Sequence, residues 1–238
     1  MRRIAVTFAL PAEFAAWRRQ RKFDKTKDAP LYRARIGENE INVVMTGVAC
    51  RSGDGTLREV LGRSDACIAS GLAGGLRPGY AIGSLVVGER VISDPAGSFV
   101  VGDPRLIDIA QRCGATSVSN FVTCSRIINS VAEKRQLSKV ADVVEMESFQ
   151  VLRLAHEAGV PAVAVRAISD DAHSAVPFDF NPFIGANGKI QWPSAVLAVM
   201  KAPQNLPQLI RFGKESSRAA RNLSLFLDGY VRVLMSEI

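Results

Sequence analysis

The chain has 238 residues, 47% of them hydrophobic, and a formal net charge of +7 at pH 7. A chain of this length can bury most of its apolar surface in one large core, and no linker, internal repeat or low-complexity tract divides it. No apolar run approaches the roughly 18 residues that span a bilayer. We therefore expect a single domain over residues 1–238 without a membrane-spanning helix, ending in a helical tail over about 192–238.

The first part of the chain alternates short apolar runs with amphipathic stretches. Met1-Arg2-Arg3 and the apolar run after it mimic a short signal peptide, but Glu13 interrupts the run, so we predict a buried first strand over Ile4 to Phe8. The next predicted elements are a helix over 12–20, a hairpin over 31–36 and 40–45, a helix over 53–61 and a buried strand over 66–70.

The densest basic stretch lies at the end of the first predicted helix, over residues 18–22. It has no base-reading motif, so we expect no nucleic-acid partner. A solvated helix end is one interpretation, and contact with an anionic membrane surface or ligand is the other.

The second part of the chain continues the same alternation. It predicts strands over 84–92 and 117–122 around a helix over 104–113, then a strand over 142–146, a helix over 147–158, a strand over 162–168 and a mostly helical segment over 206–234. Alternating strands and helices with buried strands predict an α/β fold, with helices on both faces of a largely parallel or mixed sheet.

Cysteine and histidine give no sign of a metal or a disulfide framework. The four cysteines are scattered without a CxxC pair, and the two histidines have no acidic neighbours in a ligand pattern. We expect reduced packing cysteines, a cytoplasmic protein and no bound metal.

Acidic residues stand where predicted strands end, which is where open α/β sheets build ligand sites. Glu145 and Glu147 flank Met146 at one such end. A carboxylate there can accept two hydrogen bonds from a sugar diol, and a thioether can form an apolar floor. Alternatively, Glu147 is simply an acid in the first turn of a helix, where the macrodipole favours it.

Asp170 follows another apolar strand and is preceded by Ser169. A carboxylic acid at the rim of an apolar pocket can remain protonated and donate to a leaving group. The alternative is a turn or helix cap in the polar stretch 169–171.

A glycine-rich run, Gly71-Leu72-Ala73-Gly74-Gly75, follows the strand over 66–70. Without Cβ atoms its backbone can approach an anion or a sugar closely, and a tight turn is the alternative. The run is not the spaced GxGxxG of a dinucleotide-binding fold.

Together these segments resemble the nucleoside phosphorylase and nucleosidase superfamily. The resemblance to its methylthioadenosine and adenosylhomocysteine nucleosidase branch spans roughly residues 3–172 and runs through four motifs: Ala9-Leu10-Pro11-Ala12-Glu13, Gly71 to Gly75, Val144 to Glu147 and Arg166 to Asp170. It implies a three-layer αβα fold around a central mixed sheet, usually assembled as a homo-oligomer.

The resemblance also implies roles for individual residues. Asp170 would protonate the purine N7, oriented by Ser169, and Glu13 would position the attacking water. Glu147 and Met146 would contact the ribose. The substrate site would also include Glu145, Gly71, Leu72, Ala73, Gly74 and Ile127.

Three residues depart from the family's motifs, and two of them bear on the acceptor of the sugar. Leu72 stands where a serine often contacts phosphate or the nucleophile, and Ile127 stands where nucleosidases place a base-stacking Phe. Pro11 also lacks the N–H that a phosphate loop would offer. No cofactor is expected, phosphate stays open as a co-substrate, and both hydrolysis and phosphorolysis remain possible outcomes.

Beyond residue 172 the chain is similar to a narrower group, the hopanoid-associated phosphorylases, through residues 171–177, 188–190 and 203–210. This implies release of adenine from adenosylhopane. Alternatives are a methylthioadenosine/adenosylhomocysteine-type nucleosidase, another purine nucleoside phosphorylase, and a non-catalytic nucleoside-binding protein.

A lipid-linked nucleoside would give the basic residues and a Phe-rich loop a purpose. Peripheral contact with the inner membrane surface would use Arg18, Arg19, Arg21 and Lys22, or Arg218 and Arg221, with Phe178, Phe180 and Phe183 at the entrance. The alternative is a solvated surface with a loop packed on the core.

Overall fold

The computed structural model describes residues 1–94, 97–200 and 203–238. Its strands are β1 (Arg3–Phe8), β2 (Asp24–Lys25), β3 (Leu31–Ile36), β4 (Asn39–Met45), β5 (Ala66–Gly75), β6 (Leu85–Ser93), β7 (Phe99–Val101), β8 (Thr116–Thr123), β9 (Val143–Glu145) and β10 (Ala162–Asp170). Its α-helices are α1 (Pro11–Gln20), α2 (Asp54–Leu61), α3 (Pro104–Arg112), α4 (Val131–Leu137), α5 (Ser148–Glu157), α6 (Trp192–Met200) and α7 (Leu206–Glu237). Three short 3-10 turns are η1 (Val48–Cys50), η2 (Asn181–Phe183) and η3 (Pro203–Asn205).

The strands form one mixed sheet, part of which closes on itself. Strand β10 pairs with β5 on one side and with β6 on the other, and the order continues through β8 and β9 back to β5. These five strands make a closed ring. Outside it, β1 pairs with β5 and leads to β4, β3 and β2.

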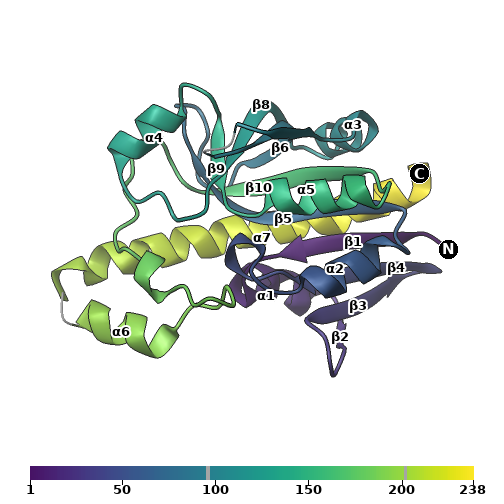
Figure 1. The fold of residues 1–238 in the computed structure, drawn as a ribbon, viewed down its shortest axis with the longest axis horizontal. Helices are drawn as coiled ribbons and strands as arrows, with labels where there is room; N and C mark the ends of the chain where they lie inside the picture. The colour runs from purple at the N-terminus through teal and green to yellow at the C-terminus, as the bar shows by residue number, and fades with distance from the viewer. Residues whose placement is uncertain (95–96, 201–202) are drawn as a thin grey trace.

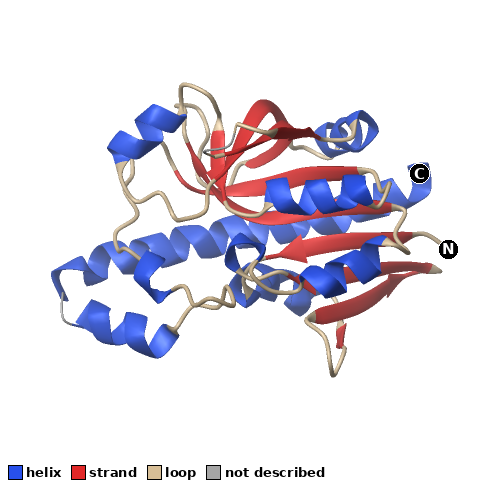
Figure 2. Cartoon of the chain, viewed as in Figure 1, coloured by secondary structure: helices blue, strands red, loops and turns tan. Residues whose placement is uncertain are grey.

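Helices cover both faces of the sheet, as Figures 1 and 2 show. One apolar core packs α1, α3 and α7 against the strands, and a second core packs α2 and α5 against the other face. The chain therefore has helices on both faces of a mixed sheet, as the alternation predicts, and the three-layer αβα architecture that the resemblance implies.

Helix α7 is part of the main core rather than a detached tail. Tyr230 donates from its hydroxyl to the carbonyl of Leu106 at 2.8 Å, and Arg21, the C-cap residue of α1, pairs with Asp228 at 2.6 Å. Its buried apolar face recurs every three or four residues, at Ala219, Leu223, Leu227, Tyr230 and Leu234. The predicted tail also includes residues 201–202, which lie outside the described residues.

Two predicted boundaries are wrong, and both concern the site. The glycine-rich run 71–75 is neither a turn nor a loop, because it continues β5 as extended strand. Ser169 and Asp170 likewise belong to β10 and form no cap. In both places the pairing of β5 with β10 extends each strand beyond its apolar run.

Other predicted elements agree with the structure, but among the strands and α-helices of the described residues three have no counterpart in the sequence prediction: β2, β7 and α4. Each has seven residues or fewer, which is too short for a periodic pattern to show. Within the described parts of the chain, no helix combines the length and the hydropathy that a membrane crossing requires.

Candidate active site

The candidate site lies at the carboxyl ends of the parallel strands β1, β5 and β10, at the end of the sheet away from both termini (Figure 1). β1 pairs with the first part of β5. β9 pairs with the last two residues of β5, along the same edge of that strand. Between these neighbours, the backbone N–H of Leu72 is free of the ladder and donates to Oε1 of Glu13 at 3.0 Å. A break in the sheet therefore receives a carboxylate from α1.

Glu13 is held by three backbone donors. Its Oε2 accepts from Ala9 and Leu10 at 3.1 and 2.9 Å, in the turn that starts α1, while Oε1 accepts from Leu72. The helix can begin here because Pro11 needs no N–H partner in the first turn. Burial raises the pKa of Glu13, and the bond from Leu72 partly offsets that rise.

Arg166 of β10 is the centre of a buried charge cluster. Its Nη1 donates to the carbonyl of Ser70 at 2.7 Å, and its Nη2 contacts the Glu145 carboxylate and donates to Ser148 Oγ at 2.8 Å. Glu147 Oε2 lies 3.5 Å from the same Nη2. A guanidinium with no exposed surface needs such partners, because an unpaired buried charge is strongly destabilising.

Gly71 makes room for this guanidinium. It is the register partner of Arg166 in the parallel pair, and its φ is +149°. A Cβ at this position would lie 2.2 Å from Nη1 of Arg166 and 3.1 Å from Oε1 of Glu13. The glycine is thus a steric requirement of the cluster.

Glu145 and Glu147 have different partners. Glu145 is the one that caps α5: its Oε2 accepts from the N–H groups of Glu147 and Ser148 at 2.9 and 2.7 Å, and its Oε1 contacts Thr123 Oγ1. Glu147 makes no helix-cap bond, and its Oε1 instead accepts from the N–H of Ala49 at 3.0 Å. Glu147 thus stands at the N-cap position of α5, but its carboxylate is bound by η1 and not by the helix.

The N–H that reaches Glu147 comes from a strained turn, η1. Ala49 and Cys50 both have positive φ angles, of 55° and 52°, which side chains with a Cβ seldom adopt. The turn is held from outside, because Val48 N–H donates to the carbonyl of Gly188 at 2.9 Å. Strain of this kind is typical of functional sites.

Three carboxylates share one guanidinium, and this affects their protonation. Burial raises the pKa of Glu147 to about 8; Arg166 opposes that rise, while Glu145 and Glu13 add to it. The cluster therefore favours the protonated form of Glu147 more than water does.

The second centre lies further along β5. Asp170 is buried at the end of β10, with Ser169 Oγ 2.7 Å from its Oδ1 and 3.1 Å from the carbonyl oxygen of Ala73. Its Oδ2 contacts the ammonium of Lys134. A Cβ on Gly74 would lie 2.9 Å from that same Oδ2, so this glycine also provides space for a carboxylate.

The strand register fixes the spacing of the two centres. Arg166 pairs with Gly71 and Asp170 with Gly74, so the centres are three residues, or about 10 Å, apart along β5. An extended ligand with a proton-accepting group at one end and hydroxyl groups at the other could contact both centres.

Met146 and Leu72 are half-buried beside these centres. Ile127 is also half-buried, and Asn181 of η2 pairs with its backbone: Asn181 Oδ1 accepts from the N–H at 2.8 Å, and Nδ2 donates to the carbonyl at 3.0 Å. The structure thus places a side-chain amide against the segment for which the sequence predicts substrate contact.

Sequence reasoning missed Lys134 altogether and did not predict the central position of Arg166. Lys134 is on α4, a helix that the pattern does not reveal, and a lysine in a polar stretch gives no signal of burial. Arg166 did carry a signal, since an arginine inside an otherwise apolar strand needs buried acidic partners.

Several residues expected at a membrane or substrate entrance have partners within the protein. Arg18 lies over the ring of Tyr32, and Arg21 pairs with Asp228. The ring of Phe178 packs against those of Phe180 and Phe183, with centroids 4.9 and 5.6 Å away.

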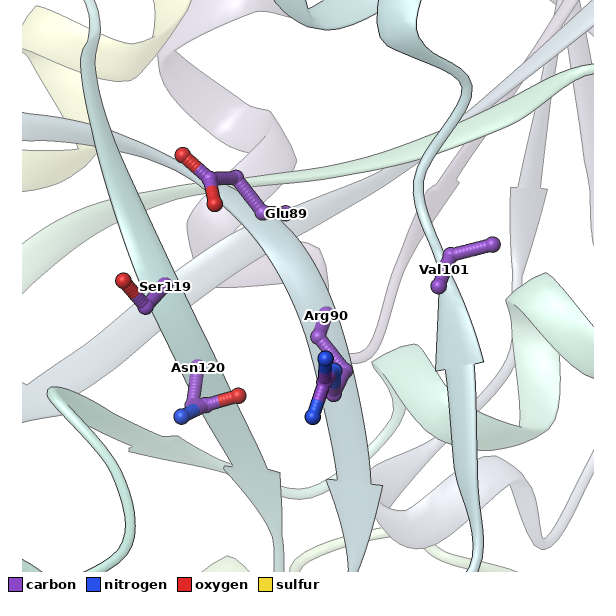
Figure 3. A pocket seen from close by; sticks show the side chains of 5 residues that line it. All are labelled: Glu89, Arg90, Val101, Ser119 and Asn120. Atoms are coloured by element: carbon purple, nitrogen blue, oxygen red, sulfur yellow. The ribbon is translucent and has the colours of Figure 1, made fainter.

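An open pocket of about 320 Å³ lies elsewhere, over β6, β7 and β8. Figure 3 shows its lining side chains, Glu89, Arg90, Val101, Ser119 and Asn120. The carboxylates of the two centres are not among them, so we do not assign this pocket to the candidate site.

Comparison with known proteins gives one matching family, described as the phosphorylase superfamily, over residues 3–189. A 5'-methylthioadenosine/S-adenosylhomocysteine nucleosidase of Shewanella oneidensis is 26% identical over 171 residues, which cover 62% of this chain and 71% of that protein. The protein of the same name from Shewanella halifaxensis is 28% identical over 144 residues, which cover 50% and 63%.

Solved structures agree with the fold. The nucleosidase of that name from Helicobacter pylori, with butyl-thio-DADMe-Immucillin-A, has a TM-score of 0.73 and 17% identity over 98% of this chain and 99% of that chain. Futalosine hydrolase from the same organism has a TM-score of 0.72 and 16% identity, covering 98% of each chain. At this identity the likeness concerns the fold alone.

Proposed function

The chain belongs to the phosphorylase superfamily, and from this premise we propose that it is an enzyme that cleaves the N-glycosidic bond of an adenine nucleoside and releases adenine. The observation that carries the proposal is the pair of centres along β5. One holds a carboxylate with a serine hydroxyl beside it, and the other holds carboxylates fixed around Arg166.

The two centres fit the two needs of the reaction. When the C1'–N9 bond breaks, its electron pair goes to the purine and the sugar becomes oxocarbenium-like. Asp170 would deliver a proton to the leaving base, oriented by Ser169. Glu147 would accept hydrogen bonds from the ribose hydroxyls, and Met146 would line the sugar. Negative charge near the developing cation would stabilise it.

We propose that the acceptor is water rather than phosphate. Arg166 is the cation of the cluster, but its Nη atoms already serve protein groups, and its Nε is enclosed without a partner among the described residues. The acidic groups around it disfavour a further anion. Glu13 remains able to accept from a water, since a carboxylate has about four acceptor positions.

For the substrate we propose adenosylhopane, on the resemblance of the segments after residue 172, with methylthioadenosine or adenosylhomocysteine as the alternative supported by the relatives' names. The test is chromatographic detection of free adenine from each of the three, with and without phosphate. Adenine released without phosphate supports a hydrolase, and strict phosphate dependence contradicts it. No base from any substrate would instead support a nucleoside-binding protein.

Contact with an anionic membrane surface is a further part of this proposal. α6 and the start of α7 expose apolar side chains at Trp192, Val196, Leu197, Met200, Leu206 and Ile210. Lys189 and Lys214 are exposed in the neighbouring segments. Apolar groups beside cations suit an anionic lipid surface.

Co-sedimentation with anionic liposomes at low salt tests this contact. We expect the protein to sediment, and the change Leu197→Glu to weaken binding. Leu225→Glu is the control, because Leu225 is an exposed leucine of α7 fifteen residues beyond Ile210. Equal binding by both variants would contradict the proposal. A homo-oligomer, implied by the resemblance, stays a prediction that light scattering can check.

A further inference from the structure

Lys134 is the buried cation of the second centre, and the mechanism above does not use it. Its side chain is 1% exposed. The ammonium contacts Oδ2 of Asp170 and donates to the carbonyls of Asp171 and Ser174 at 2.6 and 2.9 Å. All three of its donors are therefore used, and one of them points at the acid of the proposed reaction.

We propose that Lys134 is the positioning residue that supplies the proton which Asp170 passes to the leaving base. This inference rests on the proposed function. In the free protein Asp170 is then an ionised carboxylate paired with an ammonium, and the transferable proton belongs to the pair. Asp170 acts as a relay and does not carry the proton beforehand.

The charges around the pair support this state. A cation in direct contact favours the ionised form of a carboxylate, and a neutral Asp170 would leave the buried ammonium facing only two carbonyls and an uncharged acid. Asp171, just after β10, adds a second carboxylate. Burial alone would raise the pKa of Asp171, but its bonds with Ser174 and His173 and the charge of Lys134 together lower it below the ordinary value.

Other titratable groups near the pair have partners of their own. Arg211 of α7 forms an ion pair with Glu215 and also interacts electrostatically with Asp171. Tyr80, after β5, interacts with Asp142. On α4 itself the neighbouring acid, Glu133, pairs with Arg126.

The proton step balances without a further reactant. As the C1'–N9 bond breaks, the base N7 takes a proton from Asp170 and the bond's electron pair moves onto the purine. That proton comes to Asp170 from the Lys134 ammonium, which becomes a neutral amine, and Asp170 is left as the carboxylate that it was before. The water that adds to the sugar loses one proton to solvent, and the amine recovers one from solvent.

The fold holds Lys134 in place during this exchange. Its bonds to the two carbonyls do not involve Asp170, so the amine stays at the site when the carboxylate turns toward a base. α4 is itself fixed by Ser130, whose Oγ accepts from the N–H of Glu133 at 3.2 Å.

The test compares Lys134→Met, Lys134→Arg and the control Arg135→Met, which removes an exposed cation from the same helix. The rate of adenine release from methylthioadenosine is measured from about pH 5 to about pH 10. Wild type and the control should share one profile. As the pH is raised, Lys134→Met should lose activity at a lower pH than wild type does, because a carboxyl gives up its proton at lower pH than an ammonium does.

Lys134→Arg distinguishes the positioning of Asp170 by a cation from the supply of a proton to Asp170. Arginine keeps the positive charge but does not release a proton, so kcat should fall by at least about tenfold with little change in KM. A Lys134→Met profile with the shape of wild type, or full activity in Lys134→Arg, would overturn the inference. If Lys134→Met does not fold, Lys134→Arg alone decides. Absence of base release in the wild type would refute the proposed function itself.

Discussion

At the scale of single residues, Glu147 gives stability a dependence on pH. Its pKa rises from 4.5 to about 8 on folding, chiefly through burial. Between these values the folded state binds a proton that the unfolded state lacks, so stability falls as pH rises through this window, by at most about 1.4 kcal/mol per pH unit.

Glu147→Gln should remove this part of the slope. Urea unfolding at several pH values from about 5 to about 8 would measure it, with some slope remaining from Glu13, whose pKa is also raised. Glu59→Gln, at an exposed carboxylate on α2, is the control and should keep the wild-type slope. A Glu147→Gln slope equal to wild type would show that Glu147 is ionised in the folded protein.

Asp170 contributes to both activity and stability. Asp170→Asn should lower kcat about 10²- to 10⁴-fold, because an amide cannot deliver the proton. It should also destabilise the protein by about 3 to 5 kcal/mol, because Lys134 is left as an uncompensated buried charge.

The double variant Asp170→Asn/Lys134→Met distinguishes these effects. It should recover part of the lost stability, since no buried charge is left unpaired, yet regain no activity. Unfolding curves and adenine release would be measured on the same preparations. A double variant no more stable than Asp170→Asn would mean that the ion pair contributes little.

At the scale of elements, β5 depends on its glycines. Gly71→Ala places a Cβ 2.2 Å from the fully buried Arg166 guanidinium. We expect a loss of about 3 kcal/mol in unfolding free energy, together with loss of activity.

Gly213→Ala is the matched control. Gly213 lies in α7, and no atom lies within 4 Å of the position that an alanine methyl would take, so alanine there should stabilise the helix by up to about 1 kcal/mol. Thermal unfolding compares the two. Gly71→Ala with a wild-type melting temperature would mean that Arg166 can be displaced.

Much of the element order followed from the sequence because buried strands and amphipathic helices carry distinct periodicities. β1, the hairpin of β3 and β4, and helices α1, α3 and α5 were all predictable in this way. The glycine run was not, because glycine has no side chain to show a period, and its extended form depends on pairing with β10.

The site was predictable only in part for a similar reason. Strand ends bring the motif carboxylates near one another, which the chain order suggests. The contact of Glu147 depends on Ala49, nearly a hundred residues earlier, and the contact of Lys134 with Asp170 depends on a short helix. Contacts of that range leave no local pattern.

At the scale of the whole molecule, exposed and buried charged groups contribute differently. The net charge of +7 is spread over 30 basic and 23 acidic residues, and many exposed arginines form pairs such as Arg58–Glu157 and Arg112–Glu237. Pairs this exposed contribute little to stability. The buried pairs Arg166–Glu145, Arg166–Glu147 and Lys134–Asp170 are the ones on which the proposed site depends.

The closed ring of β5, β10, β6, β8 and β9 has a consequence for motion. A strand bonded on both sides cannot peel from an edge, so the amide hydrogens at the centre of β5 and β10 should exchange with solvent only when the whole molecule unfolds. Amides of η1 and η2, which lie in loops, should exchange through local opening. Deuterium would then enter the amides of the loops around a bound nucleoside, while the amides of β5 and β10 beneath it keep their hydrogens.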